Sequence, residues 1–225
     1  MMRPNLTHAI EDYIKVIHEL SLVDGRATTN RIAERLGVTP ASVTGMVKKL
    51  AATRPPLVQY SKHRGAVLTE EGERVALEII RHHRLLELYL VQVLGYDWDA
   101  VHDEADRLEH VISEEFEERI AQALGDPARD PHGDPIPNRH LQVTKDAGVQ
   151  LDLLRPGGKA VVERVLDTAP ETLQRLAEAG LVPGAQVTLV AVDEAADCVS
   201  LRVADRSAPM VLPRDLARML RVVPT

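Results

Sequence analysis

The sequence predicts a mainly α-helical chain with a small β domain at its C-terminal end. Apolar residues recur at helical spacing through the first half, turn signals flank a basic segment near the start, and residues 151–225 change to short β-branched runs. We therefore expect three parts: a winged helix-turn-helix over residues 1–75, a helical domain ending in a proline-rich linker over 76–150, and an SH3-like β-barrel over 151–225.

Residues 28–50 have the pattern of a helix-turn-helix. Thr28 or Thr29 can cap a short helix that ends at Gly37, and Thr39 with Pro40 can begin a second one. The segment LVQYSKHRGAVLT then predicts two short strands around a basic turn, which would form the wing. The second helix would face a DNA groove with small and polar side chains. The side chains expected to contact DNA are Thr39, Ala41, Ser42, Thr44, Lys48 and Arg64.

Charge is segregated along the chain. The net charge is −7, yet residues 26–65 hold eight bases and one acid, Glu34, which leaves −14 for the remainder. A basic block within an acidic protein indicates a surface that meets phosphate. We therefore expect double-stranded DNA as a partner, with a generic three-helix module as the alternative.

Composition excludes several classes. With 225 residues and 44% hydrophobic content the chain can bury a core, and no apolar run reaches the ~20 residues of a membrane span. The first residues lack the apolar block of a secretory signal, so we expect a cytoplasmic protein with no membrane partner. A single cysteine, Cys198, excludes an internal disulfide and a cysteine-based zinc site.

Metal-type side chains gather over residues 83–110. At about 100° per residue, His102, Asp106, Glu109 and His110 would share one arc of one helix. His83 and Glu87, spaced i,i+4, would project together from the preceding helix. Mixed imidazole and carboxylate ligands suit a divalent first-row metal. The alternative is a solvated acidic face, since residues 97–118 hold ten acids and one base.

These segments together resemble the diphtheria toxin repressor family of metal-activated transcription regulators, and especially its manganese-responsive branch. The resemblance rests on five segments: EDYIKVIHEL, IAERLGVTPASVTGMVKKL, HRLLELYL, VHDEADRLEH and GDPIPNRH. It covers essentially the whole chain. It implies a homodimer, which agrees with HRLLELYLVQVLG, a helix apolar nearly all round that is buried centrally or against a second subunit.

The resemblance also implies ligand roles. His83, Glu87 and His102 match the family's ancillary site, and Asp12, Asp106, Glu109 and His110 match its primary site. Two of these, Asp12 and Asp106, stand where the iron-responsive branch has methionine and cysteine, and a hard carboxylate favours manganese over softer metals. In contrast, Lys15 stands where manganese-type members often carry a second acid, which argues against a tightly bridged pair of ions.

In the C-terminal domain, VTLVAV and CVSLRVA predict strands, and ETLQRLAEAGL predicts an inserted short helix. In the family this domain donates side chains to the ancillary metal. The candidates here are Glu163, Asp167, Glu171 and Gln174, although surface carboxylates with no ligand role are the alternative for each of them.

The expected function is a metal-activated, DNA-binding transcriptional regulator of metal homeostasis. We expect two Mn²⁺ ions per subunit, with Fe²⁺ as the alternative, a pseudo-palindromic operator, and no small organic substrate. Alternatives are an iron-dependent repressor of the same family, a winged-helix repressor that senses another ligand, and a dinuclear metallohydrolase. The sequence has no HExxH, GxSxG or phosphate-loop motif, so we do not expect an enzyme.

Overall fold

The computed structural model describes residues 6–144, 147–204, 206 and 208–225. The chain forms two compact units. The first comprises Met1–His83 with Glu109–Ile112 and Pro137–Gln142, and the second comprises Arg84–Leu108, Ser113–Ile136 and Val143–Thr225. Helix α4 (Glu70–Gln92) is continuous through the boundary between them.

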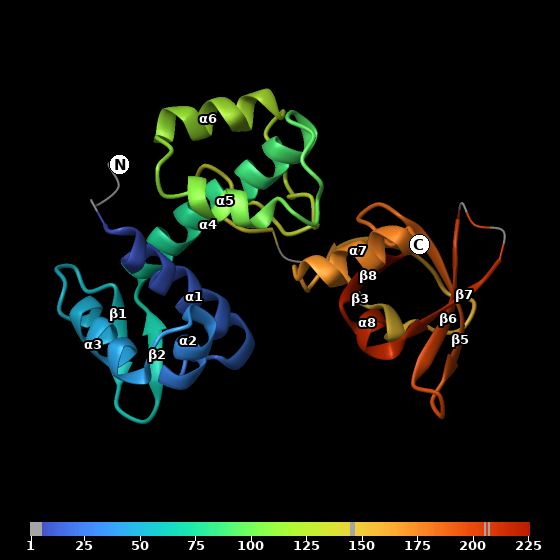
Figure 1. Ribbon diagram of the computed structural model, residues 1–225, viewed down its shortest axis with the longest axis horizontal. Coiled ribbons are helices and arrows are strands. Elements are labelled where there is room, and N and C mark those ends of the chain that lie inside the picture. The colour runs from blue at the N-terminus through green and yellow to red at the C-terminus, as the bar shows by residue number, and fades with distance from the viewer. Residues whose placement is uncertain (1–5, 145–146, 205, 207) are drawn as a thin grey trace. The chain divides into compact units, whose positions relative to one another are not determined.

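The first unit contains the predicted winged helix-turn-helix, drawn in blue to teal in Figure 1. Its elements before α4 are α1 (His8–Asp24), α2 (Thr29–Leu36), α3 (Pro40–Ala51), β1 (Val58–Ser61) and β2 (Gly65–Leu68). The strands pair antiparallel, and Ala27 forms a bridge with Ala66, which attaches the wing to the segment between α1 and α2.

Local capping explains where the two helices of the motif begin and end. The Thr28 hydroxyl accepts a hydrogen bond from the Arg31 amide at 3.3 Å, and α2 ends at Gly37, whose φ of 64° favours glycine. Helix α3 begins at Pro40. Before it, Thr39 Oγ1 accepts a hydrogen bond from the Ser42 amide at 3.2 Å. These features confirm the expected caps. Between the helices, fully buried side chains such as Ile14, Ile17, Ile32 and Leu50 form the core.

The helical part of the second unit consists of the end of α4 with α5 (His102–Leu108) and α6 (Glu114–Ala123). Leu85 and Leu86 are almost completely buried, whereas Val93 and Leu94, in the turn directly after α4, are more than half exposed. The apolar helix therefore packs within the chain, and the apolar turn that follows it is left uncovered by this chain.

The C-terminal region of the second unit is an antiparallel sheet with strand order β3-β8-β4-β5-β6-β7 (Figure 1). The strands are β3 (Val149–Gln150), β4 (Lys159–Val165), β5 (Gln186–Asp193), β6 (Cys198–Val203), β7 (Met210–Pro213) and β8 (Leu220–Pro224). The helical elements are the 3₁₀ turn η1 (Leu151–Leu153), α7 (Pro170–Ala179) and α8 (Arg214–Arg218). The strands predicted at VTLVAV and CVSLRVA are confirmed as β5 and β6, and the inserted helix as α7.

The prediction that the proline-rich segment is a linker is wrong for residues 130–137. These residues lie almost entirely inside the fold, and Asp130, His132 and Asp134 are each less than one-tenth exposed. The Asp130 carboxylate accepts hydrogen bonds from the backbone amides of His132 and Asp134, at 2.8 and 2.9 Å. This side-chain turn satisfies backbone groups that a buried loop would otherwise leave unpaired.

Among the described residues, no helix combines the length and the apolar character needed to cross a bilayer.

Candidate metal centre and nucleic-acid interface

Helix α5 is shorter than predicted. It ends at Leu108, and Glu109 and His110 lie in the turn that follows. The expectation of one helical stripe from His102 to His110 is therefore wrong. No glycine or proline marks the end of this helix in the sequence. In this turn Glu109 is 1% exposed, whereas Val111 is 63% exposed.

The turn after α5 meets α1 within the first unit. The ligand-type atoms of Asp12, Glu109 and His110 all lie within 4.8 Å of one another. Nε2 of His110 is 3.0 Å from Oδ1 of Asp12 and 3.5 Å from Oε1 of Glu109. We call this group the first cluster. It contains three of the four predicted primary-site residues.

Glu11 is a further residue of this region that the sequence analysis did not identify. Its Oε2 lies 2.6 Å from Nδ1 of His110, and its side chain is almost fully buried. Hydrogen bonds with Asp12 and Glu11 outweigh the opposing effect of burial and raise the pKa of His110 to about 9. The adjacent acids at 11 and 12 could have suggested this role, because a carboxylate commonly orients a ligating imidazole from its far nitrogen.

Glu109 also contacts two nitrogen atoms on its other side. Its Oε2 lies 2.6 Å from Nδ1 of His83 and accepts a hydrogen bond from Nζ of Lys15 at 2.8 Å. Burial alone would raise the pKa of Glu109, but the hydrogen bond with His83 and the charge of Lys15 outweigh it and lower the pKa below its usual value. Glu109 is therefore held as a buried carboxylate.

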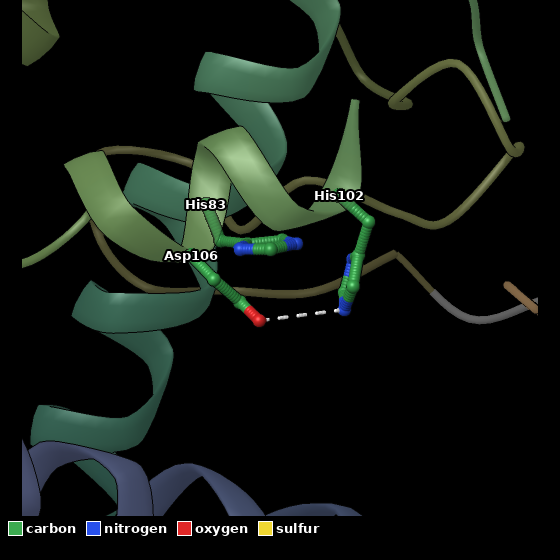
Figure 2. Close-up of side chains that lie close together, drawn as sticks. All are labelled: His83, His102 and Asp106. Atoms are coloured by element: carbon green, nitrogen blue, oxygen red, sulfur yellow. Dashed lines mark ion pairs between the residues drawn. The ribbon is translucent and has the colours of Figure 1, made fainter. Parts of the chain in front are cut away.

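Asp106, the fourth predicted primary-site residue, belongs to the second unit. It lies on α5 with its side chain about half exposed, and its Oδ2 is 3.7 Å from Nε2 of His102 (Figure 2). His102 Nδ1 in turn is 3.0 Å from Oε1 of the buried Glu87. Of the predicted ancillary residues, Glu87 and His102 contact each other directly, and His83, drawn with His102 and Asp106 in Figure 2, contacts Glu109 and Lys15.

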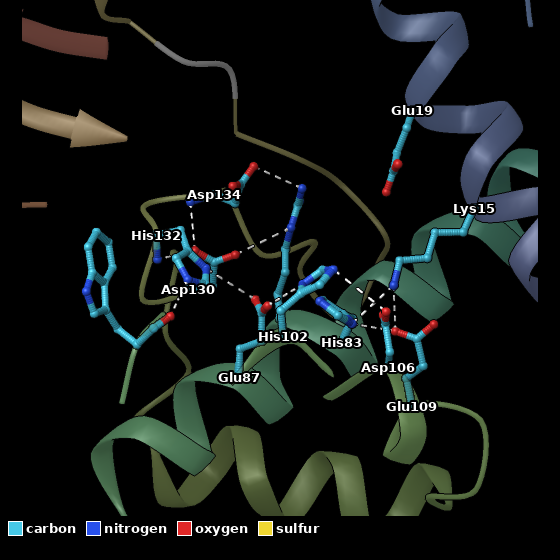
Figure 3. Close-up of polar contacts among 12 residues, drawn as sticks. Lys15, Glu19, His83, Glu87, His102, Asp106, Glu109, Asp130, His132 and Asp134 are labelled. Atoms are coloured by element: carbon cyan, nitrogen blue, oxygen red, sulfur yellow. Dashed lines mark hydrogen bonds and ion pairs between the residues drawn. The ribbon is translucent and has the colours of Figure 1, made fainter. Parts of the chain in front are cut away.

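A second cluster surrounds Glu87 in the second unit. The ligand-type atoms of Glu87, Asp130 and His132 all lie within 4.8 Å of one another, and all three residues are buried. Nδ1 of His132 is 3.7 Å from Oε2 of Glu87, so the two oxygens of Glu87 face two different imidazoles (Figure 3). The sequence analysis missed Asp130 and His132. Their i,i+2 spacing is visible in DPHGD, but no local pattern shows that this loop meets α4.

Charge in the second cluster is poorly compensated. Burial, followed by the negative charges of Asp134 and Glu87, raises the pKa of Asp130. Burial opposes protonation of His132, but its interactions with Glu87 and Asp130 prevail and raise its pKa to about 9. Arg84 contributes a cation, with Nε 3.7 Å from Asp130 Oδ2. Both clusters therefore concentrate buried carboxylates around an imidazole, which is the donor chemistry that divalent first-row metals accept.

The predicted C-terminal ligand candidates include two with structural contacts. Glu163 Oε1 pairs with Arg129 at 2.6 Å, and Glu163 Oε2 accepts from the Gly148 amide at 3.1 Å. Asp167 accepts from Thr172 Oγ1 at 2.8 Å near the start of α7. These contacts favour the structural alternative for both residues.

The predicted DNA face is displayed by α3 and the wing. Thr39, Ala41, Ser42 and Lys48 are exposed, Thr44 is partly exposed, and Arg64 is exposed in the β1–β2 turn. Other bases of the basic segment pair with acids of α1: Arg31 with Asp24, and Arg35 with Glu19. The bases on α3 and the wing that the structure leaves exposed are Lys48, Lys49, Lys62 and Arg64.

Comparisons with known families cover nearly the whole chain. The model of the "Iron dependent repressor, N-terminal DNA binding domain" matches residues 5–66, and that of the "Iron dependent repressor, metal binding and dimerisation domain" matches residues 69–138. The FeoA domain model matches residues 149–224. These matches, with the observed elements, confirm the expected fold class.

Individual relatives agree with these family matches. The iron-dependent repressor IdeR of Mycobacterium tuberculosis is 36% identical over 196 residues, covering 82% of this chain and 84% of its own. The diphtheria toxin repressor of Corynebacterium glutamicum is 35% identical over 201 residues, covering 83% and 85%. A solved structure of a manganese-dependent transcriptional repressor in complex with manganese superposes with a TM-score of 0.85 at 37% identity, covering 96% of this chain and all of that one. These relatives are transcriptional repressors rather than enzymes.

Proposed function

Because the chain belongs to the iron-dependent, or diphtheria toxin, repressor family of metal-dependent DNA-binding regulators, we propose that it is a repressor activated by manganese. The proposal specifies the metal, the residues that bind it and the form of the operator. Iron(II) is the alternative metal, since iron-dependent and manganese-dependent repressors are both among the relatives.

The observation that carries the proposal is the first cluster. Asp12 belongs to the first helix of the DNA-binding unit, and Glu109 and His110 belong to the turn that packs in the same unit. All three donors are oxygen or nitrogen, and hard oxygen donors favour manganese over softer metals. Asp12, Glu109 and His110 would hold the first ion, with Glu11 orienting His110.

The second cluster supports a second ion in each subunit. Glu87, Asp130 and His132 would hold it, and His102 contacts the other oxygen of Glu87. The negative charge of Glu87 contributes to the raised pKa values of both Asp130 and His132, which favours a divalent cation at this position even beside Arg84. Whether His83 and Asp106 also act as ligands stays a prediction.

The chain's own residues explain how metal could control DNA binding. Without a metal ion, the three carboxylates of Glu11, Asp12 and Glu109 outnumber the cations that they contact, His110 and Lys15, so the pairing of α1 with the turn after α5 is weaker than it would be with metal. A bound divalent ion would supply the positive charge that stabilises this pairing. The first helix packs against α2, and α2 packs against α3, so the first helix would then hold the two helices in one arrangement.

A dimer follows from the family and agrees with the exposed apolar turn directly after α4, where Val93 and Leu94 are uncovered by this chain. Two-fold symmetry would place two α3 helices in successive major grooves. We therefore propose a pseudo-palindromic operator with half-site centres about 34–36 Å apart, or at a multiple of that distance. A cytoplasmic location is part of the same proposal, because the DNA partner is there.

The test is a DNA-binding titration with an operator selected from a random duplex library. Binding is followed by fluorescence anisotropy in chelated buffer and then with Mn²⁺, Fe²⁺ without oxygen, Zn²⁺ or Co²⁺. The proposal expects binding with Mn²⁺ and little in chelator. Activation at saturating metal is compared, because nitrogen and oxygen sites bind Zn²⁺ more tightly than Mn²⁺ whatever their role. Equal DNA affinity with and without metal would contradict the proposal.

A further inference from the structure

Lys15 places a cation inside the first cluster. It lies on α1 about one turn after Glu11 and Asp12, and its side chain is only 13% exposed. Its Nζ donates to Oε2 of Glu109 at 2.8 Å and lies 3.1 Å from Nδ1 of His83 (Figure 3). The ammonium group is therefore within contact distance of two atoms that could each ligate a metal.

The two oxygens of Glu109 serve different neighbours. Oε1 is directed toward His110, at 3.5 Å from Nε2, whereas Oε2 contacts Lys15 and His83. A carboxylate shared between two metal ions would offer one oxygen to each. Here one oxygen faces the Asp12–His110 side, where an ion would bind, and the other is already paired with an ammonium group.

A second divalent ion would also meet repulsion at this position. Two cations a few ångströms apart repel each other, and the repulsion is stronger in a partly buried site because the local dielectric constant is lower than in water. An ammonium is a compact cation with three donors and no acceptor, so it cannot itself ligate metal while it remains charged.

We propose that Lys15 is a resident cation that restricts the first cluster to a single metal ion, by occupying the position beside Glu109 Oε2 that a second ion would need. This inference rests on the proposed metal-dependent function and deepens it. Lys15 would also neutralise Glu109 before metal binds, so it would stabilise the metal-free protein and lower its affinity for the first ion.

The experiment uses Mn²⁺ as the probe and the full chain carrying Glu87→Gln, which removes a donor from the second cluster. Into this parent are introduced Lys15→Glu, Lys15→Met and the charge-conserving control Lys15→Arg. Mn²⁺ content and affinity are measured by calorimetry, spin coupling by electron paramagnetic resonance, and metal-free stability by thermal melting.

The parent and Lys15→Arg are expected to bind one Mn²⁺ with the spectrum of an isolated ion. Lys15→Glu is expected to bind two ions and to show exchange coupling between them. Lys15→Met is expected to bind one ion at least about tenfold more tightly than the parent, because the competing cation is lost, and to melt at a lower temperature without metal.

A spin-coupled pair in the parent would overturn the proposal. So would one uncoupled ion in Lys15→Glu together with unchanged affinity in Lys15→Met. If Lys15→Glu fails to fold, the affinity and melting temperature of Lys15→Met decide, with Lys15→Arg as the reference. A parent that binds no Mn²⁺ would instead contradict the proposed function, so the two failures are distinguishable.

Discussion

Nε2 of His110 lies 3.0 Å from Oδ1 of Asp12 and joins the turn after α5 to the first helix of the DNA-binding unit. The two residues are far apart in the sequence, and neither forms a metal site alone. Their contact is the physical reason to expect that an ion bound here affects the elements that meet DNA.

His110 and Asp106 form a matched pair of variants. His110→Ala removes a member of the first cluster and is expected to abolish manganese-dependent DNA binding while the dimer stays folded. Asp106→Ala removes a side chain that contacts His102 instead, and is expected to retain a manganese response. Anisotropy with DNA and analytical ultracentrifugation check both. Equal loss in the two variants would show that Asp106 joins the first site when metal binds.

Asp12 is expected to determine which metal activates the protein. In Asp12→Met a soft thioether replaces a hard carboxylate, so the ratio of activation by Fe²⁺ to activation by Mn²⁺ should rise. The measurement is DNA binding at saturating Fe²⁺ and Mn²⁺ without oxygen, with Asp12→Asn as the control that keeps an oxygen donor. An identical metal preference in the Met and Asn variants would refute the hard-ligand argument.

The DNA face is tested by its salt dependence. Lys48→Ala and Arg64→Ala should each weaken binding to all sequences and lower the slope of log affinity against log salt by about 1 for a lost phosphate contact. Changes at Ser42 or Thr44 should instead alter the preferred sequence. Arg119→Ala is the control, since Arg119 is an exposed base on α6 that pairs with Glu115. If the control and the two test variants have the same slope, the DNA face lies elsewhere.

Metal binding is expected to release protons. The pKa of His110 is raised to about 9 by Asp12 and Glu11, so its imidazole is protonated below that pH, whereas a ligating imidazole must be neutral. Mn²⁺ affinity should therefore fall by up to about tenfold per unit as pH decreases from 9 towards 7. The raised pKa of His132 predicts the same direction at the second cluster.

Calorimetry in buffers of different ionisation enthalpy measures this release directly. About one proton per bound ion is expected at pH 7.5. Lys48 belongs to neither cluster, so Lys48→Ala should release the same number. Binding without proton release would show that His110 is not a ligand.

Local chemistry made the DNA-binding unit predictable. The caps at Thr28 and Thr39, the proline at position 40 and the glycine at 37 each act within a few residues, and the structure has them as expected. The alternation of β-branched residues predicted β5 and β6 for the same reason.

The metal centre could be predicted only in part, because it depends on tertiary contacts. Helical periodicity predicted that Glu109 and His110 belong to α5. In the structure the helix ends before them, and Glu109 lies in the following turn, where it contacts His83 and Lys15. The loop containing Asp130 and His132 has the composition of a linker and lies buried against other elements. Resemblance to a family supplied the ligand types and drew attention to Lys15, whereas the contacts of Lys15 with Glu109 and His83 required the positions of atoms.

The most direct test of the central claim measures Mn²⁺ affinity with and without the selected operator duplex. If binding of metal at the first cluster and binding of DNA are linked, each must tighten the other by the same factor. The account predicts that saturating DNA increases Mn²⁺ affinity by the same factor by which saturating Mn²⁺ increases DNA affinity, and that His110→Ala removes both effects. An Mn²⁺ affinity unchanged by DNA would contradict it.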